Sequence, residues 1–269
     1  MRNQRHDDIL QILQARKRIT VGELTTRLSV SEVTIRKDLA LLEDMGLLTR
    51  TRGGAELAEE RDRRHTLLAR RGHNVSGKRA IAAAAAELIE EGETVYLDAG
   101  STCVLLAECL VTRTLRVVTN SIDVMMALAD APSVALFSVG GSYRKEAGSF
   151  IGPLAGTALQ QLQIDTAFLG TTGVSVDGVL SSQNTIESEL KRQVIHRARR
   201  SVVLADRSKL GRTAFSVFAR AEDVDLLVTE ATEAECPDFY ALGVEVMCTA
   251  RGEVTDGGVT TYTGRRLDR

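Results

Sequence analysis

Three short stretches of helical periodicity occupy the first 45 residues of the chain. Apolar side chains at positions 9, 10, 12 and 13 predict a first amphipathic helix. Thr20 and Glu23 have the spacing of a capping box, which predicts that a second, short helix begins there and runs to Leu28. About three residues later a third helix follows, a separation typical of the tight turn in a helix-turn-helix.

The third helix, within residues 29–43, has two chemically different faces. Ile35, Leu39 and Leu42 recur at helical spacing and predict its buried face. The outer face carries small and polar side chains in its first turns, followed by two adjacent cations: Ser31, Val33, Thr34, Arg36 and Lys37. A helix that reads base edges in a DNA groove needs such a surface. Ser29 and Ser31 both offer N-cap oxygens, and the pattern does not choose between them.

A basic hairpin is predicted after the third helix. Gly46 can end that helix, and residues 47–54 then read as a strand that runs into a Gly53-Gly54 turn. Arg50 and Arg52 alternate along this strand, so both can face a phosphate backbone. Three helices and a basic hairpin predict a winged helix-turn-helix. The alternative is a small helical bundle with a solvated basic face.

From residue 93 onward, short β-rich runs alternate with helical stretches. The predicted strands are 94–98, 115–119, 134–138, 166–170, 201–205 and 226–229, and the predicted helices include 78–88, 104–110, 124–128 and 185–199. This alternation is typical of βαβ units with a parallel sheet covered on both faces. The fold class is therefore α/β: a winged helix-turn-helix followed by a Rossmann-like domain.

Small and polar residues gather at the predicted carboxyl ends of these strands, where α/β sheets bind ligands. They are Asp98, Gly100, Ser101, Thr102, Thr119, Asn120, Gly140, Gly141, the run 171–173 and Asp206. The Gly100-Ser101-Thr102 turn between a strand and a helix can seat a phosphate on backbone N–H groups and hydroxyls. It has neither the Walker spacing nor GxGxxG. Lys209 can supply a counter-cation, or it is an ordinary loop lysine.

Composition sets limits on the class of protein. The 269 residues are 43% hydrophobic, enough for one substantial core and a smaller domain, and the net charge is −2. Arg and Lys are concentrated before residue 80, and local charge governs DNA affinity. There is no apolar run of about eighteen residues, so we expect a cytoplasmic protein without a membrane partner. The four Cys form no CxxC pair and the four His are scattered, which predicts neither a metal site nor a cofactor.

The expected domains are 1–57, the DNA-binding domain, and 76–249, the ligand-sensing domain. Residues 58–75 are charged with weak periodicity and are interpreted as a linker, with Ser76 as the cap of the helix that follows. Residues 250–269 form a Gly- and Thr-rich tail that either adds a strand or stays disordered.

Residues 5–55 resemble the N-terminal domain of the DeoR family of bacterial transcriptional regulators. The matching motifs are Ile9-Leu10, Val21-x-Glu23-Leu24, Leu28-x-Val30-Ser31, Thr34-Ile35-Arg36-x-Asp38-Leu39, Leu42-Glu43, Gly46-x-Leu48-x-Arg50 and Gly53-Gly54-Ala55. The resemblance implies a double-stranded DNA operator as partner, contacted by Ser31, Val33, Thr34, Arg36, Lys37, Arg50, Arg52, Gly53 and Gly54.

Residues 76–249 resemble the effector-binding domain of the same family, which is similar in fold to sugar-phosphate isomerases. The matching motifs are Asp98-x-Gly100-Ser101-Thr102, Thr119-Asn120, Gly140-Gly141, Gly152, Glu187 with Lys191, and Asp206-x-Ser208-Lys209-x-Gly211. Cys103 stands where the family commonly has Thr. The resemblance implies a phosphorylated sugar as effector and adds Glu187 to the binding residues, with no catalytic residue.

Two functions follow as alternatives. The first is a repressor of carbohydrate genes that works as a homo-oligomer, dimer or tetramer, paired through the effector domains or the Ala-rich helix, and that leaves its operator when the effector binds. The second is a sugar-phosphate isomerase or deaminase carrying a DNA-binding domain, with Asp98, Asp165, Glu187 or Asp206 as the proton-transferring carboxylate.

Overall fold

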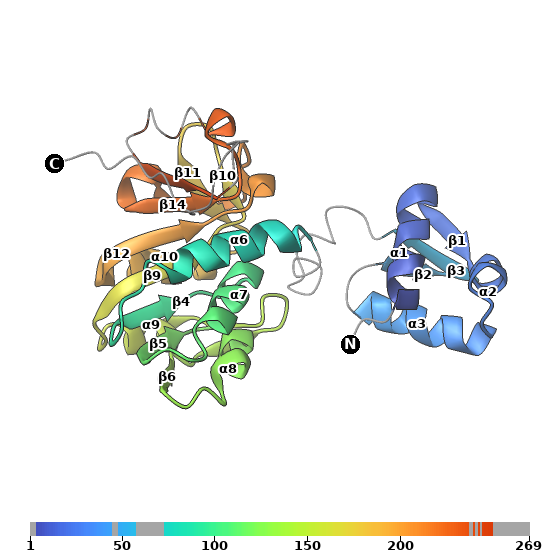
Figure 1. Ribbon diagram of the computed structural model, residues 1–269, viewed down its shortest axis with the longest axis horizontal. Coiled ribbons are helices and arrows are strands. Elements are labelled where there is room, and N and C mark those ends of the chain that lie inside the picture. The colour runs from blue at the N-terminus through green and yellow to red at the C-terminus, as the bar shows by residue number, and fades with distance from the viewer. Residues whose placement is uncertain are drawn as a thin grey trace, which may run out of the picture. The chain divides into compact units, whose positions relative to one another are not determined.

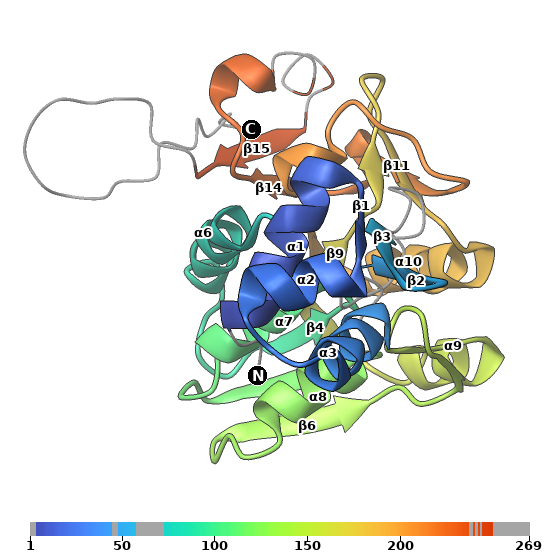
Figure 2. The same cartoon turned by 90° about the vertical axis from the view of Figure 1, so that its right-hand side faces the viewer.

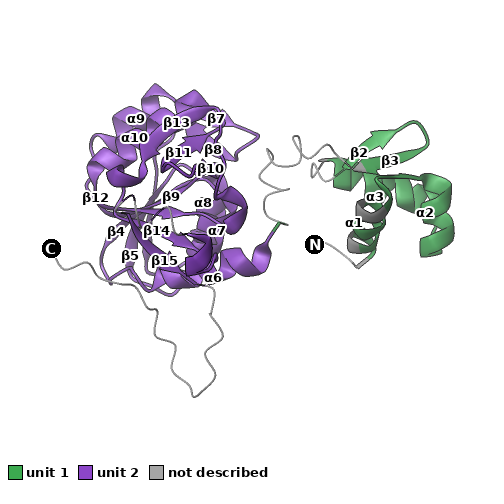
Figure 3. Cartoon of the chain, turned by 90° about the horizontal axis from the view of Figure 1, so that it is seen from above, with its two compact units in different colours: residues 1–73 green, residues 74–269 purple. Residues whose placement is uncertain are grey.

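The structure of the protein is a computed structural model that describes residues 4–44, 48–57, 73–236, 239, 242 and 244–249. The chain forms two compact units, residues 1–73 and residues 74–269 (Figure 3). Gly46, most of the predicted linker and the tail 250–269 lie outside the described residues. The predicted domain limits at 57 and 76 therefore stay predictions.

The described residues of the first unit form three helices and a three-stranded antiparallel sheet (Figure 2). Its elements are α1 (Gln4–Arg16), β1 (Arg18–Thr20), α2 (Val21–Leu28), α3 (Glu32–Asp44), β2 (Leu48–Thr51) and β3 (Gly54–Leu57). Their shared core contains Ile9, Leu13, Leu24, Ile35 and Leu39, all at most 1% exposed. This is the predicted winged helix-turn-helix, with β1 added to the predicted hairpin in the order β1-β3-β2.

The structure resolves which serine caps the third helix. Ser31 Oγ accepts the backbone N–H of Thr34 at 3.3 Å, so Ser31 is the cap of α3. Ser29 has φ +53° and ends α2 as its C-cap. Thr20 and Glu23 form the predicted capping box, each side chain accepting the other's backbone N–H.

Only Gly53 of the predicted Gly-Gly turn lies in the turn, with φ +90°. Gly54 is the first residue of β3 and is buried, opposite Thr20 of β1 and Thr51 of β2. A Cβ at position 54 would lie 2.2 Å from the carbonyl oxygen of Ile19. Gly54 is thus required by the close approach of β1, which the sequence did not reveal.

The second unit is built on a seven-stranded parallel sheet (Figure 1). Its strands are β4 (Thr94–Leu97), β5 (Leu115–Thr119), β6 (Val134–Ser138), β9 (Ile164–Gly170), β12 (Ala198–Leu204), β14 (Leu226–Thr229) and β15 (Glu245–Cys248). Their spatial order is β15-β14-β12-β9-β4-β5-β6. The first strand therefore lies inside the sheet, and the later strands extend from it in both directions. This Rossmann-like order confirms the predicted α/β fold.

Helices cover both faces of the sheet. Neighbouring residues of each strand point to opposite faces, and both faces carry apolar side chains that must be buried. Val95 and Leu97 pack with α6 (Val75–Ala86), α7 (Ser101–Cys109) and α8 (Ile122–Leu128). Tyr96 faces the other core, with α9 (Pro153–Leu159) and α10 (Thr185–Arg197).

Two predicted helix starts are wrong. Asn74, in a left-handed conformation and without a side-chain capping bond, precedes α6, so Ser76 is not its cap. Helix α7 begins at Ser101, directly after Gly100, rather than at Val104.

Antiparallel additions that the sequence did not predict lie beside the parallel sheet. One is the hairpin of β7 (Ser142–Arg144) and β8 (Ser149–Ile151). The other is a three-stranded sheet of β10 (Gly173–Val174), β11 (Val179–Ser182) and β13 (Ser216–Arg220). The described part of this unit also has three single 3-10 turns: η1 (Arg207–Lys209), η2 (Ala221–Asp223) and η3 (Glu233–Glu235). Within the described ranges, no helix has the length and apolarity to cross a membrane.

Candidate functional sites

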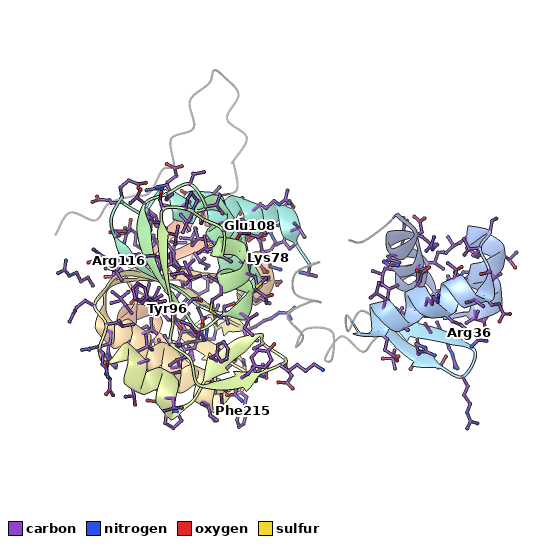
Figure 4. The ribbon with its side chains drawn as sticks, turned by 90° about the horizontal axis from the view of Figure 1, so that it is seen from below. Arg36, Lys78, Tyr96, Glu108, Arg116 and Phe215 are labelled. Atoms are coloured by element: carbon purple, nitrogen blue, oxygen red, sulfur yellow. The ribbon has the colours of Figure 1, made fainter. Side chains whose placement is uncertain are left out.

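The outer face of α3 is open to solvent, as expected for a groove-reading helix. Val33 is 63% exposed, and Arg36, labelled in Figure 4, and Lys37 are exposed beside it. The Arg36 guanidinium lies 3.3 Å from Glu32 one turn earlier, a solvated pair that costs little to break. An exposed Val among polar groups offers a contact for a thymine methyl, and the two cations are suited to phosphate or guanine.

The remaining predicted DNA contacts divide between exposed and buried positions. Ser31, Arg50, Arg52 and Gly53 are exposed, and Thr34 is half-buried. The backbone N–H of Arg50 donates to Glu43 Oε1 at 2.8 Å, which ties β2 to the end of α3. Gly54 is buried in the sheet between β1 and β2, so its role is in the packing of the hairpin.

A buried carboxylate fixes α3 against α1. Asp38 is 7% exposed and accepts from Arg5 Nε at 2.5 Å and Arg5 Nη2 at 3.1 Å. Its Oδ1 also lies 2.9 Å from His6 Nε2. Burial opposes ionisation, but the hydrogen bonds from Arg5 and His6 outweigh it and lower the pKa of the Asp38 carboxyl. These contacts set the orientation of the reading helix.

We expect Asp38→Asn to destabilise the first unit by about 1.5–3 kcal/mol, the range for hydrogen bonds to a charged group. Because the folded pKa is lowered, the contribution of Asp38 is full above the unfolded pKa of about 4 and is lost as pH falls through the folded value. Urea unfolding of the full chain at pH 7 and pH 3 measures this. If wild type and variant differ in unfolding free energy by the same amount at pH 7 and pH 3, the ionised Asp38 carboxylate is not what stabilises the unit.

The second candidate site lies between β4 and β9, at the topological switch point of the sheet, where the order in which strands are added reverses. Their chain neighbours continue on opposite sides, and in open α/β sheets ligands bind outside the carboxyl ends of strands at such a point. Asp98 follows β4 and Gly170 ends β9. Asp98 Oδ2 accepts the backbone N–H of Gly170 at 3.0 Å, which joins the two strand ends.

Four charged side chains form a chain at this point. Lys191 of α10 donates to Asp98 Oδ2, and to the carbonyl oxygen of Gly170 at 2.8 Å. Glu187, one turn earlier, has Oε1 at 3.6 Å from the Lys191 ammonium and accepts from Arg144 Nη1 of β7 at 3.1 Å. Burial lowers the pKa of Lys191, but Asp98 and Glu187 outweigh this and raise it overall, so the ammonium stays charged. Both carboxylates are therefore ion-paired.

Several buried polar atoms near these charges have no hydrogen-bond partner among the described residues. They are Asp98 Oδ1, both amide atoms of Asn120, and Ser149 Oγ. Asp98 and Asn120 follow paired residues of β4 and β5, and Asn120 O accepts from Phe150 N of β8 at 2.7 Å. Ser149 lies opposite Arg144 in the β7–β8 hairpin. We call Asp98, Asn120, Ser149, Glu187 and Lys191 the switch-point cluster.

Unpaired buried polar atoms are rare because each one costs free energy. In the switch-point cluster, the unpaired oxygens of Asp98 and Asn120 are acceptors, the Asn120 Nδ2 group is a donor, and the Ser149 hydroxyl can donate or accept. Sugar hydroxyls, which both donate and accept, can pair with all of them.

The predicted phosphate seat lies beside this cluster. Ser101 and Thr102 are buried in the first turn of α7, and Gly100 leaves its N-terminus without a side-chain cap. Backbone N–H groups of that turn can therefore bind an anion. Cys103 points away into the core, donates to the carbonyl oxygen of Phe168, and has a thiol pKa raised to about 12 by burial. The Cys at this position therefore removes no hydroxyl from the seat.

Other residues predicted to contact the effector also have a structural role in the fold. Thr119 Oγ1 donates to the carbonyl oxygen of Leu97 at 2.6 Å, which bridges β4 and β5. Gly140 and Gly141 have positive φ, and a Cβ on Gly141 would lie 2.6 Å from Ile151 O. Lys209 ends η1 and is half-buried, and its backbone N–H donates to Asp206 O at 2.8 Å. Arg144, Ser149 and Lys191 are the residues that the sequence analysis did not assign to the site.

No cluster of three or more His, Cys, Asp or Glu side chains suited to a metal ion occurs in the described part of the chain. The charges that the structure does bring together at the switch point are paired Asp, Glu, Lys and Arg. They fit the binding of an uncharged polyol portion beside a phosphate.

Two family models match the chain. The DeoR-like helix-turn-helix domain matches residues 5–61, and the DeoR C terminal sensor domain matches residues 73–231. The first match lies within the first compact unit, and the second begins at the boundary between the two units and ends at residue 231.

Curated proteins are similar along most of the chain. The transcriptional repressor AccR of Agrobacterium fabrum is 34% identical, covering 84% of this chain and 89% of its own. The HTH-type transcriptional repressor GlcR of Bacillus subtilis is 33% identical, covering 92% and 96%. The lactose phosphotransferase system repressor of Streptococcus mutans is 32% identical, covering 86% and 93%.

Among solved structures, a ribose 5-phosphate isomerase from Methanocaldococcus jannaschii aligns with 51% of this chain and 55% of its own. The sequence identity is 22% and the TM-score is 0.39.

Proposed function

This chain belongs to the DeoR family of transcriptional regulators, and on that premise we propose that it represses genes of carbohydrate use and is released from its operator by a phosphorylated sugar. The first unit reads a DNA duplex through α3 and the β2–β3 hairpin. The second unit binds the sugar portion at the switch-point cluster and the phosphate at residues 100–102 with Lys209. The unpaired buried atoms of Asp98, Asn120 and Ser149 carry the proposal for the sugar.

The relatives favour a regulator over the enzyme alternative. Relatives matched over most of the chain are named repressors or transcriptional regulators. Proton transfer between carbons also needs a carboxylate that is available to the reacting carbon, whereas Asp98 and Glu187 each form an ion pair, with Lys191 and Arg144. The chain is a regulator without enzymatic activity.

A second copy of the chain is part of the proposal, since paired reading helices match repeated or palindromic half-sites. Of the two contact regions expected from sequence, the Ala-rich helix is the less suitable. Ala82, Ala84, Ala85 and Ala86 of α6 are buried within their own unit. Pairing through other surfaces of the effector unit is therefore favoured. Sedimentation of the full chain, with and without a duplex carrying two half-sites, measures the number of copies.

We expect Arg36→Ala to weaken binding of a duplex selected from a random library by about 5- to 150-fold, as loss of a specific base or phosphate contact would. Fluorescence anisotropy at physiological salt measures it. Arg113→Ala, which removes an arginine ion-paired with Glu91 in the second unit, is the matched control. Equal affinities for wild type and Arg36→Ala would remove Arg36 from the interface.

Replacing Lys209 with Ala should abolish release from the selected duplex and leave affinity for that duplex unchanged. The panel of probes is glucose 6-phosphate, fructose 6-phosphate, ribose 5-phosphate and glycerol 3-phosphate, each scored first by thermal shift of the wild type. Unphosphorylated glucose, fructose, ribose and glycerol are the controls for the phosphate. Release that persists at the same probe concentration would remove Lys209 from the site.

A further inference from the structure

The first turn of α6 is joined to the loops after β12 and β14 by polar side chains, of which Lys78, Asp206 and Glu230 are buried and Asn74 is half-buried. The Lys78 ammonium, labelled in Figure 4, lies 3.7 Å from Asp206 Oδ2, and the two side chains are 3% and 2% exposed. Asn74 Nδ2 donates to Glu230 Oε1 at 2.5 Å. We call Asn74, Lys78, Asp206 and Glu230 the α6 clasp.

Asp206 gives the α6 clasp its connection to the proposed ligand site. Its Oδ1 accepts the backbone N–H of Ser208 at 3.0 Å, inside η1, while its Oδ2 faces Lys78. The residue that ends η1 is Lys209, the proposed partner of the phosphate. One carboxylate therefore links the ligand loop to α6.

Glu230 makes the same kind of link one strand further along the sheet. Its carboxylate accepts the backbone N–H of Arg207 at 3.0 and 3.1 Å as well as the Asn74 amide. A Cβ built on Gly77 would lie 2.8 Å from Glu230 Cγ, so the first turn of α6 packs directly against this side chain.

Buried ions keep their partners because an unpaired buried charge is strongly unfavourable. If a ligand phosphate draws Lys209 and turns η1, the Asp206 carboxylate turns with it, and Lys78 must follow. The first turn of α6 then moves as well. Asn74 is the first residue of the second compact unit, so this turn is where the unit joins the chain that leads to the reading helix.

We infer that the α6 clasp, through the Lys78–Asp206 ion pair, couples ligand binding at the switch point to operator binding. The inference rests on the proposed function and adds to it the residues that transmit the signal. The effector and the operator DNA then both favour one of two positions of the same element, the first turn of α6. Each ligand therefore changes the affinity for the other by the same factor.

The test is a double variant that removes the charges and keeps the loop bond. Lys78→Met with Asp206→Asn leaves an amide oxygen to accept from Ser208 and removes both charges of the Lys78–Asp206 pair. Asp165→Asn with Arg199→Met is the control for the same kinds of substitution at a more exposed site, an ion pair of 3.4 Å near the amino ends of β9 and β12. In the control, an amide oxygen likewise remains for the Thr94 N–H that Asp165 accepts.

For the wild type and the control, the panel compound with the largest thermal shift should weaken binding of the selected duplex about 5- to 150-fold. For the clasp variant the thermal shift should remain, and the change in duplex affinity should fall below about two-fold. Release retained by the clasp variant, or lost by the control as well, overturns the inference.

A second arm needs only the duplex. Because coupling is reciprocal, duplex binding should change hydrogen exchange at the amides of residues 208–210 in the wild type and not in the clasp variant. If no panel compound shifts the wild type, the proposed effector class fails and this arm alone decides. Unchanged exchange in the wild type, or an equal change in both proteins, overturns the inference.

Discussion

Lys191→Met is expected to cost the second unit about 3–5 kcal/mol of unfolding free energy, because it leaves a buried carboxylate without its cation. Asp98 is 1% exposed, and Lys191 is its direct ion-pair partner at the junction of β4 and β9. The methionine keeps most of the length of the side chain and replaces the ammonium, 5.4 Å from the centroid of the Phe218 ring, with an apolar group. Urea unfolding of the full chain at pH 7 measures the loss.

The double variant Asp98→Asn with Lys191→Met is the control for this prediction. It removes both charges, and the amide oxygen of Asn can still accept from Gly170, so most of the stability should return. Lys191→Met alone costing less than about 1 kcal/mol would show that the ion pair is solvated. A double variant no more stable than the single one would place the effect in packing rather than charge.

Both variants should also lose the thermal shift produced by sugar phosphates, for different reasons. The single variant leaves Asp98 free to turn away from the ligand, whereas the double variant replaces the acceptor that a sugar hydroxyl would meet. Lys191 is thus assigned to hold Asp98 in place, a positioning role that its three partners at the switch point require.

The parts of the fold that the sequence predicted are those whose patterns are local. The strand at Leu226–Thr229 and the helix faces of Ile35 and Leu39 follow from periodicity and burial over a few residues. Strands β10, β11 and β13 were missed: β10 has two residues, and β13 pairs with β11, from which α10 and β12 separate it in the chain. Their apolar positions alternate over too few residues to form a readable period.

The same distinction applies to the site. Carboxyl ends of parallel strands meet at one edge, so Asp98 and Asn120 could be placed there from sequence. Lys191 lies on a helix 93 positions from Asp98, and nothing local distinguishes it from other helical lysines except its i, i+4 spacing from Glu187. Asp38 was visible only as part of the family motif, and its contacts with Arg5 and His6 come from the packing of α1 against α3.

Gly54→Ala should destabilise the first unit by about 3 kcal/mol, at the upper end of the cost of overpacking. The added Cβ would meet the carbonyl oxygen of Ile19 at 2.2 Å, and because this contact is backbone, β1 and β3 must separate. Small domains have only a few kcal/mol to lose, so a large fraction should be unfolded at 37 °C. Hydrogen exchange at the amides of α3 in the full chain measures the loss.

Alanine variants of two other glycines in the same unit distinguish steric overlap from backbone strain as the cause of the destabilisation by Gly54→Ala. Gly22 of α2 has an ordinary backbone and nothing within 4 Å of the place that an added Cβ would take, so Gly22→Ala should be neutral or stabilising by up to about 1 kcal/mol. Gly53 also has open space but φ +90°, so Gly53→Ala should cost about 1–2 kcal/mol through backbone strain alone. If Gly54→Ala is no worse than Gly53→Ala, the close approach of β1 is not what requires glycine there. If it is clearly worse, loss of duplex binding by Gly54→Ala follows from loss of the folded hairpin, and Gly54 needs no contact with DNA.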